Sequence, residues 1–343
     1  MKAFVIDHYK GPLRQAEVPE PAVGARDVLV EVKAAGVNQL DEKIRLGEFR
    51  QILPYRMPLI LGHDLAGVVI AVGAGVRKFR PGDGVYARPA KDRVGTFAER
   101  ISVHEDDLAL KPASISMREA GSLPLVALTA WQALVERGNV NPGQKVLIHA
   151  GAGGVGSIAI QLAKHLGAFV ATTASASNAD WVRELGADLV IDYRSQDFED
   201  VLHGYDLVLD SVGGENLERS LRVLRPGGRV IGIAGPPDPR FAKEIGASAP
   251  LRLAMTVLSS RIRRQARRRN VSYEFLFMRA DGGQLQEISS LVDAGAIRPV
   301  VGQVFPVDQT RQAVSAAGAG GGRGKVVVDN ELPTILAKGE ESS

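Results

Sequence analysis

The sequence has no cysteine among its 343 residues. This absence excludes disulfide bonds, thiolate nucleophiles, iron–sulfur clusters and any metal site that needs sulfur ligands. A chain without disulfides is typical of a reducing compartment. The first seven residues have the pattern of a charged strand, without the apolar centre and cleavage site of a secretory signal. We therefore expect a cytoplasmic protein.

Long apolar runs are also missing, since none approaches the roughly 20 residues of a membrane-spanning helix. We expect no membrane partner. An excess of one charge is missing as well, because 42 Lys and Arg residues face 39 Asp and Glu residues. One basic run, residues 261–269, holds six arginines and could bind the phosphates of a nucleic acid. We favour a solvated helix or loop, and expect no nucleic-acid partner.

The length of the chain predicts two domains, because one hydrophobic core usually stops growing at about 250–300 residues. Residues 28–32 and 67–72 carry β-branched side chains bounded by glycine and charged residues, as strands do. Residues 80–85 contain the Pro-Gly signal of a tight turn. These patterns predict an all-β, barrel-like substrate domain in the first hundred residues. We assign residues 1–122 and 282–343 to this domain and residues 123–281 to the second.

From residue 144 onward, expected strands alternate with expected helices. This interleaving favours parallel strands joined by right-handed crossovers, the doubly wound arrangement of an α/β fold. A buried helix over residues 126–137 precedes it, and a helix over 284–294 with a closing strand over 325–328 follows. The expected strands cover residues 145–150, 168–173, 188–191, 206–210, 229–234 and 273–278, and the expected helices cover residues 157–166 and 178–185.

The first of these strands runs directly into Gly151-Ala152-Gly153-Gly154-Val155-Gly156, which matches G-x-G-x-x-G. Gly151 permits the tight turn, Gly153 lets a pyrophosphate approach the backbone, and Gly156 permits close packing of helix on strand. Free N–H groups at the start of the following helix attract phosphates. Inside a strand–turn–helix of an alternating α/β domain, the motif predicts dinucleotide binding.

The end of the next strand indicates which nucleotide binds. An NAD site places Asp or Glu about 20 residues beyond the glycine loop, where it accepts hydrogen bonds from the ribose. Residues 171–177 hold no carboxylate and include Ser175 and Ser177. A 2′-phosphate would meet no charge repulsion there, so we expect NADP(H). Arg194 is the nearest candidate for a phosphate contact, and a surface arginine without a ligand is the alternative.

Residues 62–69 are similar to the G-H-E-x-x-G stretch of zinc alcohol dehydrogenases, in which the histidine binds the metal. The cysteine ligands of those enzymes are absent from this chain. We therefore interpret His63 as a hydrogen-bonded structural histidine and expect no metal site.

Taken together, several motifs resemble the zinc-free quinone oxidoreductase branch of the medium-chain dehydrogenase/reductase superfamily. The resemblance covers about residues 1–328. Residues 273–295 are similar to the reticulon-interacting mitochondrial oxidoreductase and its bacterial relatives. The segments that carry the resemblance are residues 36–43, 62–69, 150–156, 185–188, 191–193, 209–214 and 323–327.

This resemblance implies a GroES-like β-barrel domain and a Rossmann domain, with NADPH in the cleft between them. It also implies a homodimer that pairs through residues 273–278. A lysine that often meets the 2′-phosphate in the family is replaced here by Asn178. By position, the cofactor contacts would be Lys43, Ala152, Gly154, Val155, Ser175, Tyr193, Ser211, Ile233, Phe275, Phe277 and Arg323.

The implied reaction is hydride transfer from NADPH to a quinone or to the C=C bond of an enone or enal. Negative charge then develops on the carbonyl oxygen, and a hydrogen-bond donor or a cation must stabilise it. Asn38, Lys43 and Tyr55 are the catalytic candidates, and simple packing is the alternative for Tyr55. Asn38 stands where zinc-dependent relatives carry a cysteine. A nucleic-acid-binding protein and a zinc-type alcohol dehydrogenase are the rival functions.

Overall fold

The computed structural model describes residues 1–332, which form two compact units. Unit 1 comprises Met1–Pro124, Ala280–Asp293 and residues 299–332, and unit 2 comprises Leu125–Arg279 and Ala294–Arg298. The five residues Ala294–Arg298, which we assigned to the substrate domain, thus belong to unit 2, and residues 123–124 and 280–281, which we assigned to the second domain, belong to unit 1. Residues 333–343, also assigned to that domain, lie outside the described residues.

A seven-stranded sheet forms the centre of unit 1. Its longest strand, β3 (Asp27–Val37), pairs antiparallel with β5 (Leu65–Val72), β7 (Arg100–His104) and β16 (Lys325–Asp329). The two ends of the sequence therefore share one sheet. The remaining strands of this sheet are β6 (Gly84–Ala87), β8 (Leu108–Leu110) and β15 (Val301–Pro306), and β1 (Lys2–Ile6), β2 (Arg14–Glu17) and β4 (Leu59–Ile60) form a small second sheet.

Unit 1 also holds helices, so the expectation of β structure alone in the first hundred residues was wrong. The helix α1 (Gln39–Arg45) begins where the Asp41 carboxylate accepts a hydrogen bond from the backbone N–H of Asn38 at 2.7 Å. An Asn followed three residues later by an acid is a helix-start signal that we did not use. The other helical segments are η1 (Glu105–Asp107), α2 (Met117–Gly121), α11 (Gly282–Asp293), η4 (Val307–Gln309) and α12 (Thr310–Ala319).

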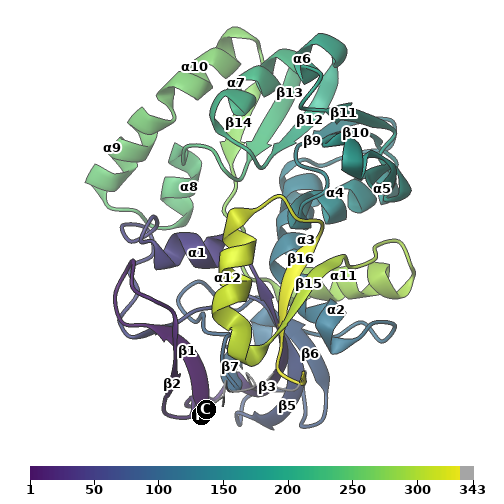
Figure 1. Cartoon of the computed structure of the whole chain (residues 1–343). Helices are drawn as coiled ribbons and strands as arrows, with labels where there is room; N and C mark the ends of the chain where they lie inside the picture. The colour runs from purple at the N-terminus through teal and green to yellow at the C-terminus, as the bar shows by residue number, and fades with distance from the viewer. Residues whose placement is uncertain (333–343) are drawn as a thin grey trace, which may run out of the picture. The chain divides into compact units, whose positions relative to one another are not determined.

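Unit 2 is built on a six-stranded sheet in the order β11-β10-β9-β12-β13-β14 (Figure 1). All five strand pairs are parallel, which confirms the doubly wound prediction. The order reverses direction between β9 and β12, so right-handed crossovers place helices on both faces of the sheet. The strands are β9 (Lys145–Ile148), β10 (Phe169–Ala174), β11 (Leu189–Asp192), β12 (Tyr205–Asp210), β13 (Leu224–Gly232) and β14 (Ser272–Phe275).

Two predicted elements of unit 2 differ in the structure, and one stretch of the unit holds helices that were not predicted. The buried helix expected over residues 126–137 is α3 (Pro124–Trp131) followed by a π-helix, η2 (Gln132–Arg137). The strand expected over 273–278 ends at Phe275, and α8 (Pro239–Glu244), α9 (Ala249–Leu258) and α10 (Ser260–Arg268) fill a stretch where only the basic run had been noted. The others are α4 (Gly154–His165), η3 (Ala176–Asn178), α5 (Ala179–Glu184), α6 (Phe198–Val201) and α7 (Gly214–Val223).

No helix within residues 1–332 is both long and apolar enough to span a bilayer.

Candidate cofactor and substrate site

The predicted cofactor residues of unit 2 gather along one edge of its sheet. Parallel pairing aligns Ala174 of β10 with Asp192 of β11, and Gly232 of β13 with both Asp210 of β12 and Phe275 of β14. The strands therefore share a carboxyl-terminal edge, where doubly wound sheets bind their ligands. The predicted residues at or just beyond this edge are Gly151, Ala152, Gly153, Gly154, Val155, Gly156, Ser175, Ser177, Tyr193, Arg194, Ser211, Ile233, Phe275 and Phe277.

Two of the loop glycines are required for packing. A Cβ atom on Gly151 would overlap the hydroxyl of Thr172, and one on Gly156 would overlap the carbonyl oxygen of Ala150. Ala150 itself has a φ of 53°, in the left-handed region that non-glycine residues seldom adopt. The loop therefore makes a sharp turn between β9 and α4, with no room for side chains at its first and last glycines.

The central glycine differs from its neighbours because it faces open space. A Cβ atom on Gly153 would meet only the Ala150 carbonyl oxygen, at 3.4 Å. Among the described residues, none accepts a hydrogen bond from the backbone N–H groups of Gly154, Val155 and Gly156, which open α4. Unpaired amides, the positive end of a helix dipole and free space beside them fit a diphosphate.

A buried histidine just before the glycine loop anchors it to the neighbouring elements. His149 is 1% exposed, with Nδ1 lying 3.1 Å from Thr173 Oγ1 and Nε2 lying 2.9 Å from Ser220 Oγ. The same Thr173 hydroxyl accepts a hydrogen bond from the Ala150 N–H at 3.1 Å. Burial lowers the pKa of His149 from 6.5 to about 4, so the ring stays neutral near pH 7. Both ring nitrogens thus act as neutral hydrogen-bonding groups that fix the end of β9.

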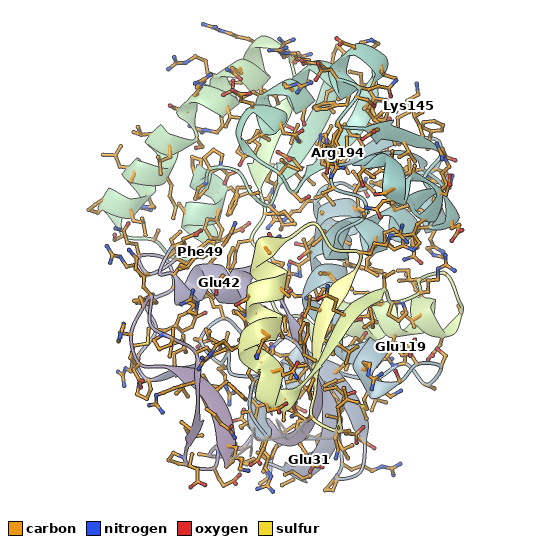
Figure 2. All side chains as sticks on the ribbon, viewed as in Figure 1. Glu31, Glu42, Phe49, Glu119, Lys145 and Arg194 are labelled. Carbon is orange, nitrogen blue, oxygen red and sulfur yellow. The ribbon has the colours of Figure 1, made fainter. Side chains whose placement is uncertain are left out.

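The segment after β10 offers hydroxyl and amide groups. Ser175 Oγ lies 3.0 Å from Ser177 Oγ and accepts a hydrogen bond from Asn178 Nδ2 at 3.1 Å. Beyond the neighbouring strand β11, the Arg194 guanidinium lies over the Tyr193 ring, 5.7 Å from its centroid, and Arg194 is labelled in Figure 2. This part of the edge presents a cation and hydroxyls, a combination that suits a phosphate better than a ribose diol alone.

Further along the edge, β12 is followed by a tight turn. The buried Asp210 carboxylate accepts hydrogen bonds from the N–H groups of Val212 and Gly213 at 2.8 and 3.1 Å. This turn holds Ser211, whose hydroxyl donates to the His149 carbonyl oxygen at 3.2 Å. Phe275 and Phe277 both contact the Phe241 ring, with centroid distances of 5.0 and 5.7 Å.

A buried polar cluster occupies unit 1 where β3 leads into α1. The Lys325 ammonium donates to Asn38 Oδ1 at 2.5 Å, to Asp64 Oδ2 at 3.2 Å and to the Val37 carbonyl oxygen at 2.9 Å. Asn38 Nδ2 in turn donates to Asp64 Oδ2 at 3.0 Å. The side chains of Lys325 and Asp64 are 7% and 0% exposed. The Lys325 ammonium therefore lies directly beside Asn38. The sequence had not indicated either charged partner of Asn38, Lys325 or Asp64.

His63 is hydrogen-bonded, as predicted. Its Nδ1 lies 2.6 Å from Asp41 Oδ1, and both side chains are fully buried. Its Nε2 has no hydrogen-bond partner among the described residues. Asp41 thus joins the histidine to the first turn of α1, since its other carboxylate oxygen accepts from the Asn38 N–H. No group of three or more His, Asp or Glu residues within residues 1–332 could hold a metal ion.

The other predicted residues of unit 1 differ in exposure and in the hydrogen bonds that their side chains already make. Lys43 is half-buried on α1 and makes no ion pair with the described residues. Tyr55 donates its hydroxyl proton to the Lys91 carbonyl oxygen at 2.8 Å, and burial raises its pKa to about 12. Arg323 is exposed, ahead of β16. Asn38 has its side-chain oxygen and nitrogen already paired, so Lys43 keeps the freest polar group of the catalytic candidates.

Two family profiles match the chain. One, described as an alcohol dehydrogenase GroES-like domain, covers residues 24–113, and the other, described as a zinc-binding dehydrogenase, covers residues 185–328. The first lies within unit 1, which agrees with the predicted GroES-like domain. The second begins in unit 2 at Leu185, just after α5, and extends to the last strand of unit 1.

Relatives named as oxidoreductases align along most of the chain. The zebrafish (Danio rerio) mitochondrial NAD(P)H oxidoreductase RTN4IP1 is 36% identical over 88% of this chain and 83% of its own length. The chain belongs to the quinone oxidoreductase branch of the medium-chain dehydrogenase/reductase superfamily. A chloroplast NADPH-dependent alkenal/one oxidoreductase from Arabidopsis thaliana is 33% identical over 96% of this chain and 79% of its own length.

The fold comparison agrees with this membership. The solved quinone oxidoreductase of Coxiella burnetii superposes on this member of the family with a TM-score of 0.84 and is 31% identical to it, covering 96% of this chain and 99% of its own. The predicted family and fold class are confirmed, and the protein is an oxidoreductase.

Proposed function

We propose that this oxidoreductase transfers a hydride from NADPH to a quinone or to an α,β-unsaturated carbonyl compound. The observation that carries the proposal is the N-terminus of α4, where unpaired amides of Gly154, Val155 and Gly156 adjoin the open space at Gly153. The names of the relatives supply the reaction class, since one is an NADPH-dependent alkenal/one oxidoreductase and another a quinone oxidoreductase. When bound, the nicotinamide would supply the hydride.

A preference for NADPH over NADH follows from the groups beside β10 and β11. Ser175, Ser177 and Arg194 can donate hydrogen bonds to a 2′-phosphate, and no carboxylate follows Ala174 until Asp180. An acidic residue at that position would accept from a ribose diol and repel a phosphate. Asn178, where the family often has lysine, already donates to Ser175 and so keeps that hydroxyl in place.

On the substrate side, Lys43 is the residue we assign to the negative charge that develops on the carbonyl oxygen. It is a cation without an ion-pair partner among the described residues, on a helix that the Asp41–His63 contact holds to the rest of unit 1. Tyr55 remains protonated because burial raises its pKa to about 12, so it cannot act as a base near pH 7, and its hydroxyl already donates to the Lys91 carbonyl oxygen. Losing one such donor typically lowers the rate by about 100-fold or more.

Zinc independence is supported by the Lys325 ammonium. It lies 2.5 Å from the oxygen of Asn38, the residue that stands in place of the zinc-binding cysteine, and 3.2 Å from Asp64. A second cation at this position would be repelled by the ammonium and would find no thiolate.

Homodimerisation through β14 and a cytoplasmic location also belong to the proposal. Strand β14 is an edge strand of its sheet within the described residues, since it pairs with β13 alone, and an edge strand can pair with a second copy. The absence of cysteine is compatible with the reducing cytoplasm.

The test of the function is NADPH oxidation by purified protein against a panel of quinones, enones and saturated aldehydes, with metal analysis of the same sample. We expect turnover of the first two classes, weak activity with NADH and no stoichiometric zinc. Turnover of the saturated aldehydes alone, together with one zinc per chain, would show a zinc-type alcohol dehydrogenase instead.

A further inference from the structure

An unexplained surface of unit 2 consists of α9 and α10, which follow one another along one side of the unit (Figure 1). The segment from Ala249 to Asn270 contains seven arginines and no aspartate or glutamate. It also carries the most exposed large aliphatic side chains of the described residues. Neither property is used by the cofactor edge of the sheet.

Helix α9 turns apolar side chains toward solvent. Leu253, Val257 and Leu258 are 65%, 62% and 64% exposed, whereas Met255 is buried. At about 100° per residue, Leu253 and Val257 lie about 40° apart around the helix, and Leu258, at its last position, lies about 100° beyond Val257. A solvent-facing helix normally presents polar groups on this side, so the apolar stripe predicts a partner that is absent from the isolated chain.

Helix α10 presents arginines instead. It is held to unit 2 by the buried Ile262 and Ala266 and by Arg261, which pairs with Glu218 at 3.0 Å. The remaining exposed arginines of this stretch make no ion pair with the described residues. They are Arg252, Arg264, Arg267, Arg268 and Arg269.

The combination of an apolar helix surface and an arginine-rich one points to one kind of partner. An apolar stripe adjacent to unpaired arginines matches the interface of a bilayer, which offers hydrocarbon below a layer of lipid phosphates. A second copy of the chain would bring a like-charged arginine run toward the first, with no carboxylate in the segment to neutralise it. A nucleic acid would neutralise the arginines but leave the leucine and valine side chains in water.

We propose that the exposed faces of α9 and α10 form a docking surface for anionic lipid bilayers. Leu253, Val257 and Leu258 enter the interface, and the arginines of α10 bind lipid phosphates. This replaces the expectation of no membrane partner, which rested on the missing membrane-spanning segment and does not bear on docking at a membrane surface.

The test is co-sedimentation of the full chain with vesicles of phosphatidylcholine alone, or with phosphatidylserine as about a third of the lipid. We expect binding to the anionic vesicles that weakens at high salt, and little binding to the neutral ones. Replacing Arg264, Arg267 and Arg268 by Gln should lower the partition coefficient by roughly 100-fold, because each arginine contributes a factor of about 5. The pair Leu253→Ser and Val257→Ser should lower it by about tenfold or more.

Matched controls remove the same groups elsewhere. A double variant, Leu110→Ser with Val201→Ser, removes two exposed aliphatic side chains. A triple variant, with Arg50, Arg80 and Lys145 each replaced by Gln, removes three exposed charges. Both controls should bind vesicles as the unaltered protein does, and all variants should keep its NADPH oxidation rate with a water-soluble quinone.

Three results would overturn the proposal. The first is no sedimentation with the anionic vesicles at low salt. The second is a Leu253→Ser, Val257→Ser variant whose light-scattering mass halves while its vesicle binding is unchanged, because the stripe would then contact a second copy. The third is binding to a single-stranded oligonucleotide in the absence of vesicle binding, since the arginines would then serve a nucleic acid.

Discussion

An added side chain has opposite consequences at Gly153 and at Gly156, although both belong to one loop. Gly156→Ala would push a methyl group into the Ala150 carbonyl oxygen, whereas a side chain at Gly153 points into open space. We expect Gly156→Ala to lower the free energy of unfolding by about 1–3 kcal/mol. Gly153→Asp should leave it within about 1 kcal/mol, because aspartate is a favourable helix N-cap. Urea unfolding of both variants measures this difference, and equal losses would contradict the assigned roles.

The buried Lys325 gives a second prediction for single residues. Lys325→Met leaves Asp64 buried without its cation, which should cost about 3–5 kcal/mol of stability. The double variant Lys325→Met, Asp64→Asn removes both charges and should recover part of the loss. A double-mutant cycle by urea unfolding measures the coupling. Additive losses would show that the ammonium and the carboxylate do not stabilise each other.

Among elements, β9 and its glycine loop should respond to pH through His149. Unfolded histidine binds a proton near pH 6.5, but in the folded protein burial lowers the pKa of His149 to about 4. Between these values the unfolded state binds more protons, so the free energy of unfolding falls as the pH drops from 6.5 toward 4. A His149→Asn variant should lose part of this pH dependence in urea titrations across that range.

The control for this prediction is His203→Asn, which removes an exposed histidine after α6. It should keep the slope of the unaltered protein. An unchanged slope in His149→Asn would show that His149 takes up its proton alike in the folded and unfolded protein and that its contacts to Thr173 and Ser220 differ from those described.

Elements with a strong local sequence pattern were predicted correctly. The helices that were not predicted are short or have few apolar positions. The alternation of apolar strands with helices after residue 144 is a local pattern, and the glycine loop lies within it. Helix α1 has only seven residues, too few for a clear apolar period, so the capping pair Asn38 and Asp41 is its main local signal. Helices α8, α9 and α10 bury only one or two side chains each, so few apolar positions mark the side that faces the core.

For the whole molecule, the family and the fold class follow from sequence, but the buried cluster of unit 1 does not. Lys325 and Asn38 are 287 positions apart and meet only because β16 pairs with β3. No spacing along the chain indicates such a contact. By contrast, the predicted cofactor residues of unit 2 lie at or just beyond the ends of its strands, so the topology of a parallel sheet brings them to one edge.

The proposed dimer is also a property of the whole molecule. If β14 pairs with its counterpart across a two-fold axis, light scattering should give twice the mass of one chain, with no dependence on salt. A mass equal to one chain at micromolar concentrations would show that β14 does not pair with a second copy in solution, and would contradict the proposed dimer.

The most direct test of the central claim is calorimetric titration of the purified protein with NADPH and with NADH. The account predicts binding of NADPH, weaker binding of NADH, and loss of both in the folded Gly153→Asp variant, whose carboxylate would occupy and repel the diphosphate site at the start of α4. Absence of heat with either nucleotide, or unchanged NADPH affinity in Gly153→Asp, would contradict it.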